Sequence, residues 1–256
     1  MLHGLYSSAQ GALLQSRRLA VVSNNIANAG TTAFKRDLPI EHTLPQFNEL
    51  MNRPEELPHG LENQHGATAL HEVFTDFSDG PLQPTGQPLD IALRGPGFLR
   101  VADPQENEFL TRDGSLTVTA DGTLVTTDQN LAVLDPQGLA IEIPDNATQL
   151  AVGSGGIISD LRLGPIAEIG IVQPVLPDGM QPRKLGNSLY EPSEEFAAAD
   201  PQRTRVISGH LEVSGVEPTA EMVEMVQTTR AFELNMTMMQ TQDGTLSHLL
   251  DAAARI

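Results

Sequence analysis

The sequence contains no cysteine and no tryptophan, and aromatic residues make up only 4% of it. Without cysteine, disulfide bonds and thiolate metal ligands are excluded. The shortage of aromatic side chains counts against stacking platforms for bases or sugars. No run of about 18 apolar residues occurs, so we expect no membrane insertion. The first residues lack the basic start and apolar core of a secretory signal, so we expect no cleaved signal peptide.

Basic residues are scarce as well: 15 lysines and arginines stand against 33 aspartates and glutamates, a formal net charge of −18. This balance argues against nucleic acid as a partner, because phosphate backbones attract basic surfaces. Residues 1–36 hold four basic residues and no acidic one, whereas residues 217–256 hold six acidic and two basic ones. The two ends are therefore complementary in charge, which favours their pairing. The alternative is two solvated faces that contribute little.

Motifs of catalysis and metal binding are also missing. The sequence has no G-x-S-x-G, no H-E-x-x-H and no phosphate-binding loop. His59, His65 and His71 recur at six-residue steps, whereas zinc ligands come as close pairs. We interpret these histidines as solvated loop residues. We therefore expect no catalytic residue, no metal site, no cofactor and no enzymatic activity.

Amphipathic patterns mark both ends of the chain. Residues 5–28 are predicted to form a helix, because small and apolar side chains recur there at alternating steps of three and four. Asn28 and Gly30 are expected to stop it, since both residue types adopt the left-handed cap conformation at low cost. The stripe consists of Leu2, Leu5, Ala9, Ala12, Ser16, Leu19, Ser23 and Ile26.

A second helix is predicted over residues 218–254, with Pro218 suited to its first position. Asp243 and Gly244 interrupt its pattern, and we expect a local kink there. The stripe consists of Met222, Met225, Thr229, Phe232, Met236, Met239, Asp243, Leu246, Leu250 and Ala253. An ordinary core stripe is the alternative. The matching stripes at the two ends favour helices that pair with each other and with other copies of the chain, because an apolar stripe must be covered.

The middle of the chain is predicted to be β-rich. Hairpin turns are expected at residues 113–114, 121–122 and 178–179, where Asp-Gly pairs separate short apolar runs. The glycine cluster at residues 153–156 is interpreted as a turn. We predict a mainly β fold with terminal α-helices that pack together as a coiled-coil-like inner layer. The expected parts are an N-terminal helix with its signature loop (1–36), an extended proline-containing excursion (37–84), a β-rich central domain (85–210) and a C-terminal helix (211–256).

Several sequence motifs, in order along the chain, resemble those of bacterial flagellar rod and hook proteins. Residues 23–28 (SNNIAN) and 32–36 (TAFKR) are similar to the N-terminal signature of that family. Residues 209–216 (GHLEVSGV) and 221–233 are similar to the C-terminal signature, and residues 85–98 and 111–116 resemble the central domain. Two features depart from the pattern: Gly215 stands where the family usually has asparagine, and residues 243–244 interrupt a helix that is usually unbroken.

The resemblance implies a structural subunit of the flagellar basal-body rod, proximal or distal, that polymerises into the helical drive shaft between motor and hook. It implies export through the flagellar type III apparatus without a cleaved signal, and a place in the periplasmic rod. The implied partners are copies of the chain itself, other rod and hook subunits, and the export apparatus. A surface binding module or adhesin that uses the β-rich domain is the alternative. We expect oligomerisation through Leu5, Ala9, Ala12, Leu19, Asn24, Asn25, Ile26, Asn28, Phe34, Met222, Met225, Thr229, Phe232, Met236, Met239, Leu246 and Leu250.

Overall fold

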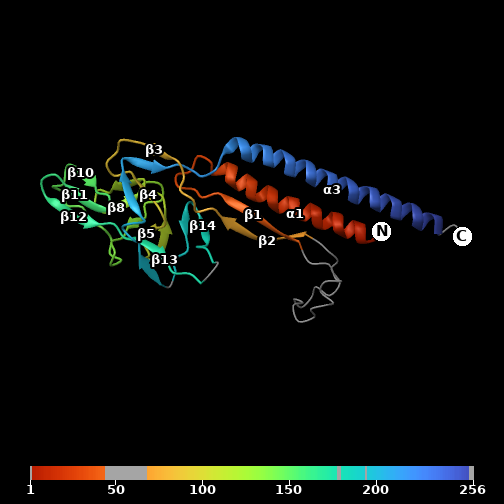
Figure 1. Cartoon of the computed structure of the whole chain (residues 1–256), viewed down its shortest axis with the longest axis horizontal. Coiled ribbons are helices and arrows are strands. Elements are labelled where there is room, and N and C mark those ends of the chain that lie inside the picture. Colours follow the sequence, from red (N-terminus) through yellow and green to blue (C-terminus); the bar gives the residue numbers. More distant parts are fainter. Residues whose placement is uncertain (1, 44–67, 178–179, 194, 254–256) are drawn as a thin grey trace. The chain divides into compact units, whose positions relative to one another are not determined.

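A computed structural model describes residues 2–43, 68–177, 180–193 and 195–253 of the chain (Figure 1). His59 and His65 lie outside these ranges. The chain forms two compact units. The helical unit consists of Met1–Ala27, Asp37–Phe74 and Glu217–Ile256, and the β unit consists of Asn28–Arg36 and Thr75–Val216. Each unit is described below on its own.

The helical unit is built on two long helices, α1 (Leu2–Ala27) and α3 (Pro218–Ala253), which run side by side (Figure 1). Strand β1 (Asp37–Thr43) pairs with β2 (Thr68–Thr75), and β1 also contacts α1. With 36 residues, α3 is about 54 Å long. It continues through Asp243 and Gly244, so the interruption in the sequence pattern does not end the helix.

Helix α1 ends at Ala27, one residue before the predicted end, but the expected capping mechanism is wrong. Neither Asn28 nor Gly30 has a positive φ angle. Instead the N–H of Thr31 donates to the carbonyl oxygen of Asn28 at 3.1 Å, which closes a turn. The left-handed conformation falls on Ala33, with φ 53°. The left-handed residue therefore lies a few positions later in the chain than the sequence pattern predicts.

The β unit contains the remaining strands, and nine of its described strands form one sheet. The sheet follows the order β14-β15-β6-β5-β9-β8-β7, with β13 also pairing to β5 and β16 to β13. A three-stranded sheet has the order β10-β11-β12, and two pairs, β17-β4 and β18-β3, are separate. The strands are β3 (Leu82–Pro84), β4 (Ile91–Arg94), β5 (Phe98–Ala102), β6 (Glu108–Thr111), β7 (Leu116–Val118), β8 (Leu124–Thr126), β9 (Ala132–Val133), β10 (Leu150–Val152), β11 (Ile157–Asp160), β12 (Gly164–Glu168), β13 (Ile171–Pro174), β14 (Lys184–Gly186), β15 (Leu189–Tyr190), β16 (Phe196–Ala198), β17 (Arg205–Ser208) and β18 (His210–Glu212).

Two of the predicted turns are confirmed and one is wrong. The turn at Gly122 joins β7 to β8, and the glycine cluster at residues 153–156 joins β10 to β11. By contrast, β6 and β7 do not pair, so Gly114 does not lie in a hairpin. A Cβ atom at Gly114 would lie 1.8 Å from the carbonyl oxygen of Ile91. This glycine allows two backbones to approach closely. The remaining predicted turn, at residues 178–179, lies outside the described residues.

Side chains from most strands of the β unit meet in one apolar core. Leu99, Val101, Leu124, Val133 and Ile158 are all fully enclosed within it. Alternation of buried and exposed positions is weak in the short strands, because β5 and β8 are covered on both sides. The chain is therefore mainly β, with one helix near each end, as the sequence predicts.

Candidate assembly surface

Helix α1 has glycine at two positions where side chains of α3 come close to its backbone. A Cβ atom at Gly11 would lie 2.8 Å from Oδ1 of Asn235, and one at Gly4 would lie 3.0 Å from Nε2 of Gln242. Because the residue number rises along one helix as it falls along the other, the helices are antiparallel. The contacts at Gly4 and Gly11 recur after seven residues on both helices, the repeat that keeps two helices facing each other.

Asn25 lies at the end of this helix pair and is 1% exposed. Its amide oxygen accepts the backbone N–H of Asp37 at 3.0 Å, and its amide nitrogen donates to the carbonyl oxygen of Asp37 at 2.9 Å. The same nitrogen donates to Oε2 of Glu221 at 3.3 Å. Glu221 is also 1% exposed. One amide therefore connects α1, the start of β1 and the first turn of α3.

The charge complementarity of the two ends is seen in an ion pair between the helices, which joins Arg18 of α1 to Glu224 of α3. Both side chains are about one third exposed. An exposed pair of this kind contributes little stability. It does favour the register of the two helices that brings these two side chains together.

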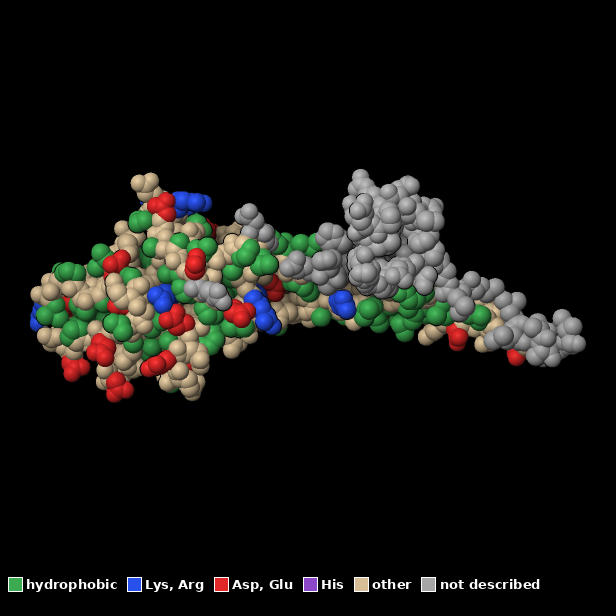
Figure 2. Space-filling model, turned by 90° about the horizontal axis from the view of Figure 1, so that it is seen from below, with side chains coloured by type: hydrophobic (Ala, Val, Ile, Leu, Met, Phe, Trp, Pro, Cys, Tyr) green, Lys and Arg blue, Asp and Glu red, His purple; other side chains and the backbone are tan. Residues whose placement is uncertain are grey.

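The outer surface of the helix pair carries a row of uncovered apolar side chains. On α3, residues 222 and 226 are four apart, as are residues 234 and 238, so the two members of each pair are neighbours on the helix surface. Figure 2 shows hydrophobic side chains gathered along the described part of the helices, with few charges among them. The exposed members are Tyr6, Leu13, Met222, Val223, Val226, Leu234 and Met238, each with 46–66% of its surface accessible. We call this set the outer apolar row.

The residues predicted to mediate oligomerisation occupy three environments. Ala12, Asn25 and Phe34 are buried within the single chain, whereas Asn24 and Met222 are exposed. The side chain of Leu250 lies outside the described residues. The others are half-buried: Leu5, Ala9, Leu19, Ile26, Asn28, Met225, Thr229, Phe232, Met236, Met239 and Leu246.

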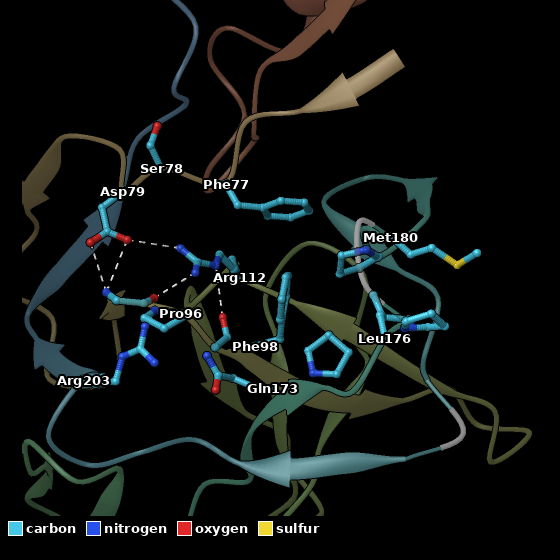
Figure 3. Close-up of a pocket in the computed structure, with 15 residues that line it drawn as sticks. Phe77, Ser78, Asp79, Pro96, Phe98, Arg112, Gln173, Leu176, Met180 and Arg203 are labelled. Carbon is cyan, nitrogen blue, oxygen red and sulfur yellow. Dashed lines mark hydrogen bonds and ion pairs between the residues drawn. The ribbon is translucent and has the colours of Figure 1, made fainter. Parts of the chain in front are cut away.

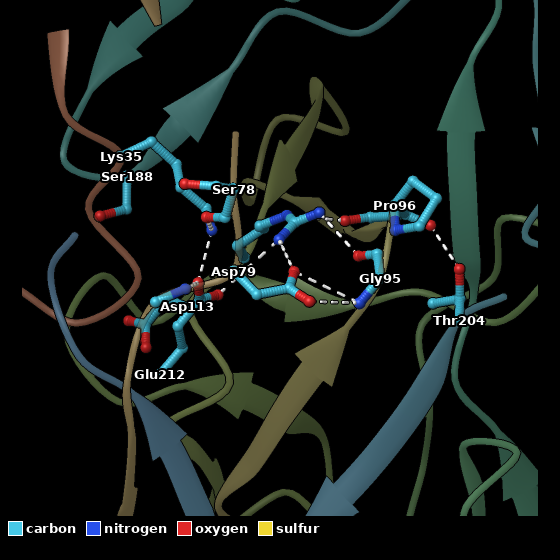
Figure 4. Close-up of polar contacts among 12 residues, drawn as sticks. Lys35, Ser78, Asp79, Gly95, Pro96, Asp113, Ser188, Thr204 and Glu212 are labelled. Atoms are coloured by element: carbon cyan, nitrogen blue, oxygen red, sulfur yellow. Dashed lines mark hydrogen bonds and ion pairs between the residues drawn. The ribbon is translucent and has the colours of Figure 1, made fainter. Parts of the chain in front are cut away.

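A buried charge cluster in the β unit was not predicted (Figure 4). The Lys35 ammonium donates to Oε1 of Glu212 at 2.5 Å and to the carbonyl oxygen of Ser78 at 2.7 Å. The side chains of Lys35 and Glu212 are each 1% exposed. Burial lowers the pKa of Lys35, and the nearby Arg112 lowers it further, while Glu212 opposes both effects.

The same cluster fixes the backbone around it. Oε1 of Glu212 also accepts the N–H of Gly80 at 2.7 Å, and the carbonyl oxygen of Glu212 accepts the N–H of Ala33 at 2.8 Å. The N–H of Gly215 donates to the carbonyl oxygen of Phe34 at 2.9 Å. The segment that follows α1 in the sequence is therefore attached to the segment that precedes α3. Both segments belong to the motifs singled out in the sequence, which is the signal that could have identified them.

A depression of about 720 Å³ opens in the β unit beside an aromatic cluster (Figure 3). The rings of Phe77 and Phe98 lie 5.7 Å apart, edge to face, and Arg112 lies over Phe98. The guanidinium of Arg112 donates to the carbonyl oxygens of Gly95 and Gly97 at 2.8 and 3.0 Å. This depression is the feature on which the alternative, a binding module, depends.

Two further kinds of site, a metal centre and a membrane-spanning helix, are absent from the described residues. No group of three or more histidine, aspartate or glutamate side chains there could hold a metal ion. None of the described helices combines the length and apolar character that crossing a lipid bilayer requires.

Three family models match the chain in sequence order. They are described as a flagella basal body rod protein (residues 5–35), the D1 domain of the flagellar hook protein FlgE/F/G (residues 92–160) and the C-terminal part of the flagellar basal body rod protein FlgEFG (residues 207–252). The first match ends with the segment that contains Lys35, and the last begins shortly before Glu212. The matches therefore include both helices and both halves of the buried ion pair.

Curated relatives match the chain over almost its whole length. The flagellar basal-body rod protein FlgG of Buchnera aphidicola subsp. Schizaphis graminum is 30% identical over 97% of this chain and 99% of its own. FlgF of Caulobacter vibrioides is 32% identical over 90% of this chain and 89% of its own. FlgF of Escherichia coli K12 is 30% identical over 94% of each chain. On these matches, the chain belongs to the flagellar basal-body rod protein family.

Proposed function

We propose that this protein is a structural subunit of the flagellar basal-body rod, which polymerises through its terminal helices into a helical shaft and transmits torque from motor to hook. Its relatives are named as rod proteins, and the matched family models describe rod and hook components. The family is structural rather than enzymatic. The proposal gives the helical unit the role of the coiled-coil-like inner layer and the β unit an outward-facing role.

The outer apolar row is the observation that carries this proposal. Covering one large apolar side chain stabilises by about 1.5–3 kcal/mol, and this row contains several in succession on a helix pair that leaves them uncovered. A helix surface of this kind requires a partner. Other copies of the same chain are suitable partners, because a contact that does not close on itself generates a helical filament.

The buried and exposed residues of the helical unit would then have different structural roles. Ala12 and Asn25 lie inside the single chain, so they would act by holding α1 and α3 together. Met222, Val226 and Leu234 are exposed, so they would form contacts between subunits. The half-buried members of the predicted set would contribute to both surfaces.

The same proposal covers the other binding partners of the subunit and its location. Neighbouring rod and hook subunits would contact the ends of the polymer, and the subunit would leave the cell through the type III export apparatus without a cleaved signal. The polymer would stand in the periplasm as part of the basal body. The strongly negative charge and the names of the relatives support this assignment, with no role for nucleic acid or membrane insertion.

The test is polymerisation of the purified full chain, followed by sedimentation and electron microscopy. Val226→Asp and Leu234→Asp place a charge in the outer apolar row and should abolish filaments, because an unpaired charge in a covered interface is costly. Gln240→Asp, an exposed polar position on the same helix, is the matched control and should assemble normally. Circular dichroism would check that all variants keep their helices. Filaments formed by Val226→Asp at the wild-type concentration would refute the proposal.

A further inference from the structure

Three arginines surround one cavity of about 600 Å³ in the β unit. Arg94 ends β4, Arg205 begins β17, and the two are directly opposite in the register of this antiparallel pair. Opposite residues project to the same face of a sheet, with Cβ atoms about 5 Å apart. Arg203, in the turn before β17, lines the same cavity and lies beside Pro96 in Figure 3.

This arrangement costs stability, since like charges that face each other across a strand pair repel. None of the three guanidinium groups makes a hydrogen bond or ion pair with a described residue. Arg100 and Arg112, by contrast, are each paired with a carboxylate. A chain with only 15 basic residues therefore places three of them together without a counter-charge of their own.

The nearby acidic groups already have other partners. Asp79 lines the cavity, but its oxygens accept the N–H of Gly95 at 3.0 and 3.3 Å, and Oδ1 lies 3.4 Å from Nη1 of Arg112. Asp200 begins the turn that carries Arg203, and its Oδ1 accepts the N–H of Gln202 at 2.9 Å. The cavity therefore retains a net positive charge.

The backbone beneath the arginines is firmly positioned, although their side chains are exposed. Gly95 has φ 97°, and a Cβ atom there would lie 2.0 Å from the carbonyl oxygen of Arg203. The N–H of Thr204 donates to the carbonyl oxygen of Asp200 at 2.8 Å, and its hydroxyl donates to the carbonyl oxygen of Pro96. The N–H of Val206 donates to the carbonyl oxygen of Ser154, which also lines the cavity. The charged groups thus extend from a fixed frame.

An acidic edge elsewhere in the β unit has complementary chemistry. Asp121, Glu142 and Asp145 are exposed, and no hydrogen bond or ion pair joins their carboxylates to described residues. The β-bridge between Thr123 and Glu142 holds these segments side by side. These three carboxylates therefore equal the three guanidinium groups in number and are opposite to them in charge.

We propose that Arg94, Arg203 and Arg205 form a carboxylate-binding site that receives the acidic edge of a second copy of this chain. This inference rests on the proposed function, because in a polymer the two surfaces would meet at every repeat of the contact. Arginine suits the task, since its guanidinium pairs with carboxylates through two hydrogen bonds. Such a contact would chiefly choose the partner surface and its register, while the helices supply most of the affinity.

The first test is a charge exchange in the full chain. Arg94→Glu/Arg205→Glu should raise the concentration needed for assembly about ten-fold at low salt. Arg162→Glu, another exposed arginine of the β unit, is the matched control and should change it less than about two-fold. Adding Glu142→Arg/Asp145→Arg to the double variant should restore assembly. Wild-type assembly by the double variant, or failure of the added arginines to restore it, would overturn the proposal.

A second test does not depend on filament formation. The chain has no cysteine, so single cysteines can report proximity. Ser154→Cys in the cavity and Asn146→Cys beside the acidic edge would be placed in separate Val226→Asp chains, mixed and mildly oxidised. A disulfide-linked heterodimer is expected at low salt, and Arg94→Glu/Arg205→Glu should abolish it. Absence of the heterodimer would overturn this proposal alone, whereas loss of wild-type polymerisation would overturn the proposed function.

A third test uses inorganic phosphate to ask whether the cavity binds a small free anion instead. If the cavity serves a small free anion, phosphate should raise the melting temperature of the wild type but not of Arg94→Glu/Arg205→Glu, and the cysteine pair should stay unlinked. That combination would exclude the second copy as the occupant. Equal melting temperatures in phosphate and in chloride of the same ionic strength, with the heterodimer present, would support it.

Discussion

Asn25 and Glu221 are 196 residues apart in sequence, yet they form a hydrogen bond of 3.3 Å in the interior of the helical unit. Both are almost completely buried. The side chain of Asn25 also forms hydrogen bonds with both the N–H and the carbonyl oxygen of Asp37. A buried polar network of this kind fixes register as well as adding stability. It connects the end of α1 to the start of α3, which is where pairing of the helices must be set.

Replacing Asn25 should therefore weaken the helical unit in particular. Asn25→Ala leaves the N–H and carbonyl of Asp37 and one oxygen of Glu221 without this partner, at a cost of about 1–3 kcal/mol. The measurement is urea unfolding of the monomer followed by circular dichroism at 222 nm. Ser23→Ala, at an exposed position on the same helix, is the control. Equal stability of the two variants would contradict a structural role for Asn25.

Close approach of the helices at Gly11 gives a second prediction. In Gly11→Val the new side chain would meet Asn235, whose Oδ1 lies only 2.8 Å from the position of the added Cβ. Overpacking of this kind costs about 1–3 kcal/mol. Asn235→Ala should recover part of that loss by making space, so the double variant should be more stable than Gly11→Val alone.

The control for that experiment is Ala20→Val, which adds a β-branched side chain at an exposed position of the same helix. It should change the free energy of unfolding by no more than about 0.5 kcal/mol. If Asn235→Ala lowers the stability of Gly11→Val further, then the two residues do not share a packing site.

The sequence predicted both helices and their seven-residue periodicity, but not the contacts that the glycines of α1 make with α3. The predicted stripes consist mainly of apolar and small side chains, such as leucine, methionine, alanine and serine. The contacts at Gly4 and Gly11 instead involve Gln242 and Asn235, and none of these four residues belongs to the predicted stripes. Glycine removes the side chain that would keep the backbones apart, and this effect appears only once the partner helix is in place.

The buried charge cluster shows another limit of prediction from the sequence. Lys35 and Glu212 both lie in segments that the sequence motifs marked, but they are 177 residues apart. Nothing local predicts that one is the partner of the other. Their pairing depends on the path of the chain through the whole β unit. The Asp121–Gly122 hairpin could be predicted, because its geometry is decided within a few residues.

The buried ion pair yields a third prediction. Lys35→Met removes the nearer of the two cations beside the buried Glu212 carboxylate and leaves Arg112, 3.9 Å away, so it should destabilise the β unit by up to about 3–5 kcal/mol. Lys35→Met/Glu212→Gln removes both charges while the amide oxygen can still accept the N–H of Gly80, so it should be more stable than Lys35→Met. Chemical unfolding monitored by the fluorescence of the tyrosines provides the measurement. A double variant no better than the single one would show that the charge of Glu212 is not the cause.

Asp160 gives a prediction about pH. Its carboxylate accepts the backbone N–H groups of Thr148, Gln149, Arg162 and Leu163 at 2.7–3.2 Å. These hydrogen bonds, those of Gln149 and Arg162 most strongly, lower the pKa of Asp160 to about 2, from an ordinary value of 3.8. The folded state therefore binds this proton less readily than the unfolded chain does. Stability from this group is complete above the ordinary value and is lost as the pH falls through the folded value.

The variant Asp160→Asn isolates this effect, because its amide group cannot accept all four N–H groups and does not titrate. The difference in urea midpoint between the wild type and Asp160→Asn should be constant above about pH 4 and should shrink between pH 4 and pH 2. The matched control is Asp121→Asn, at an exposed aspartate with no hydrogen-bonded partner among the described residues. A difference that is constant down to pH 2 would mean that the four N–H groups do not stabilise the charged form. The loop between β11 and β12 would then depend on the shape of residue 160 rather than on its charge.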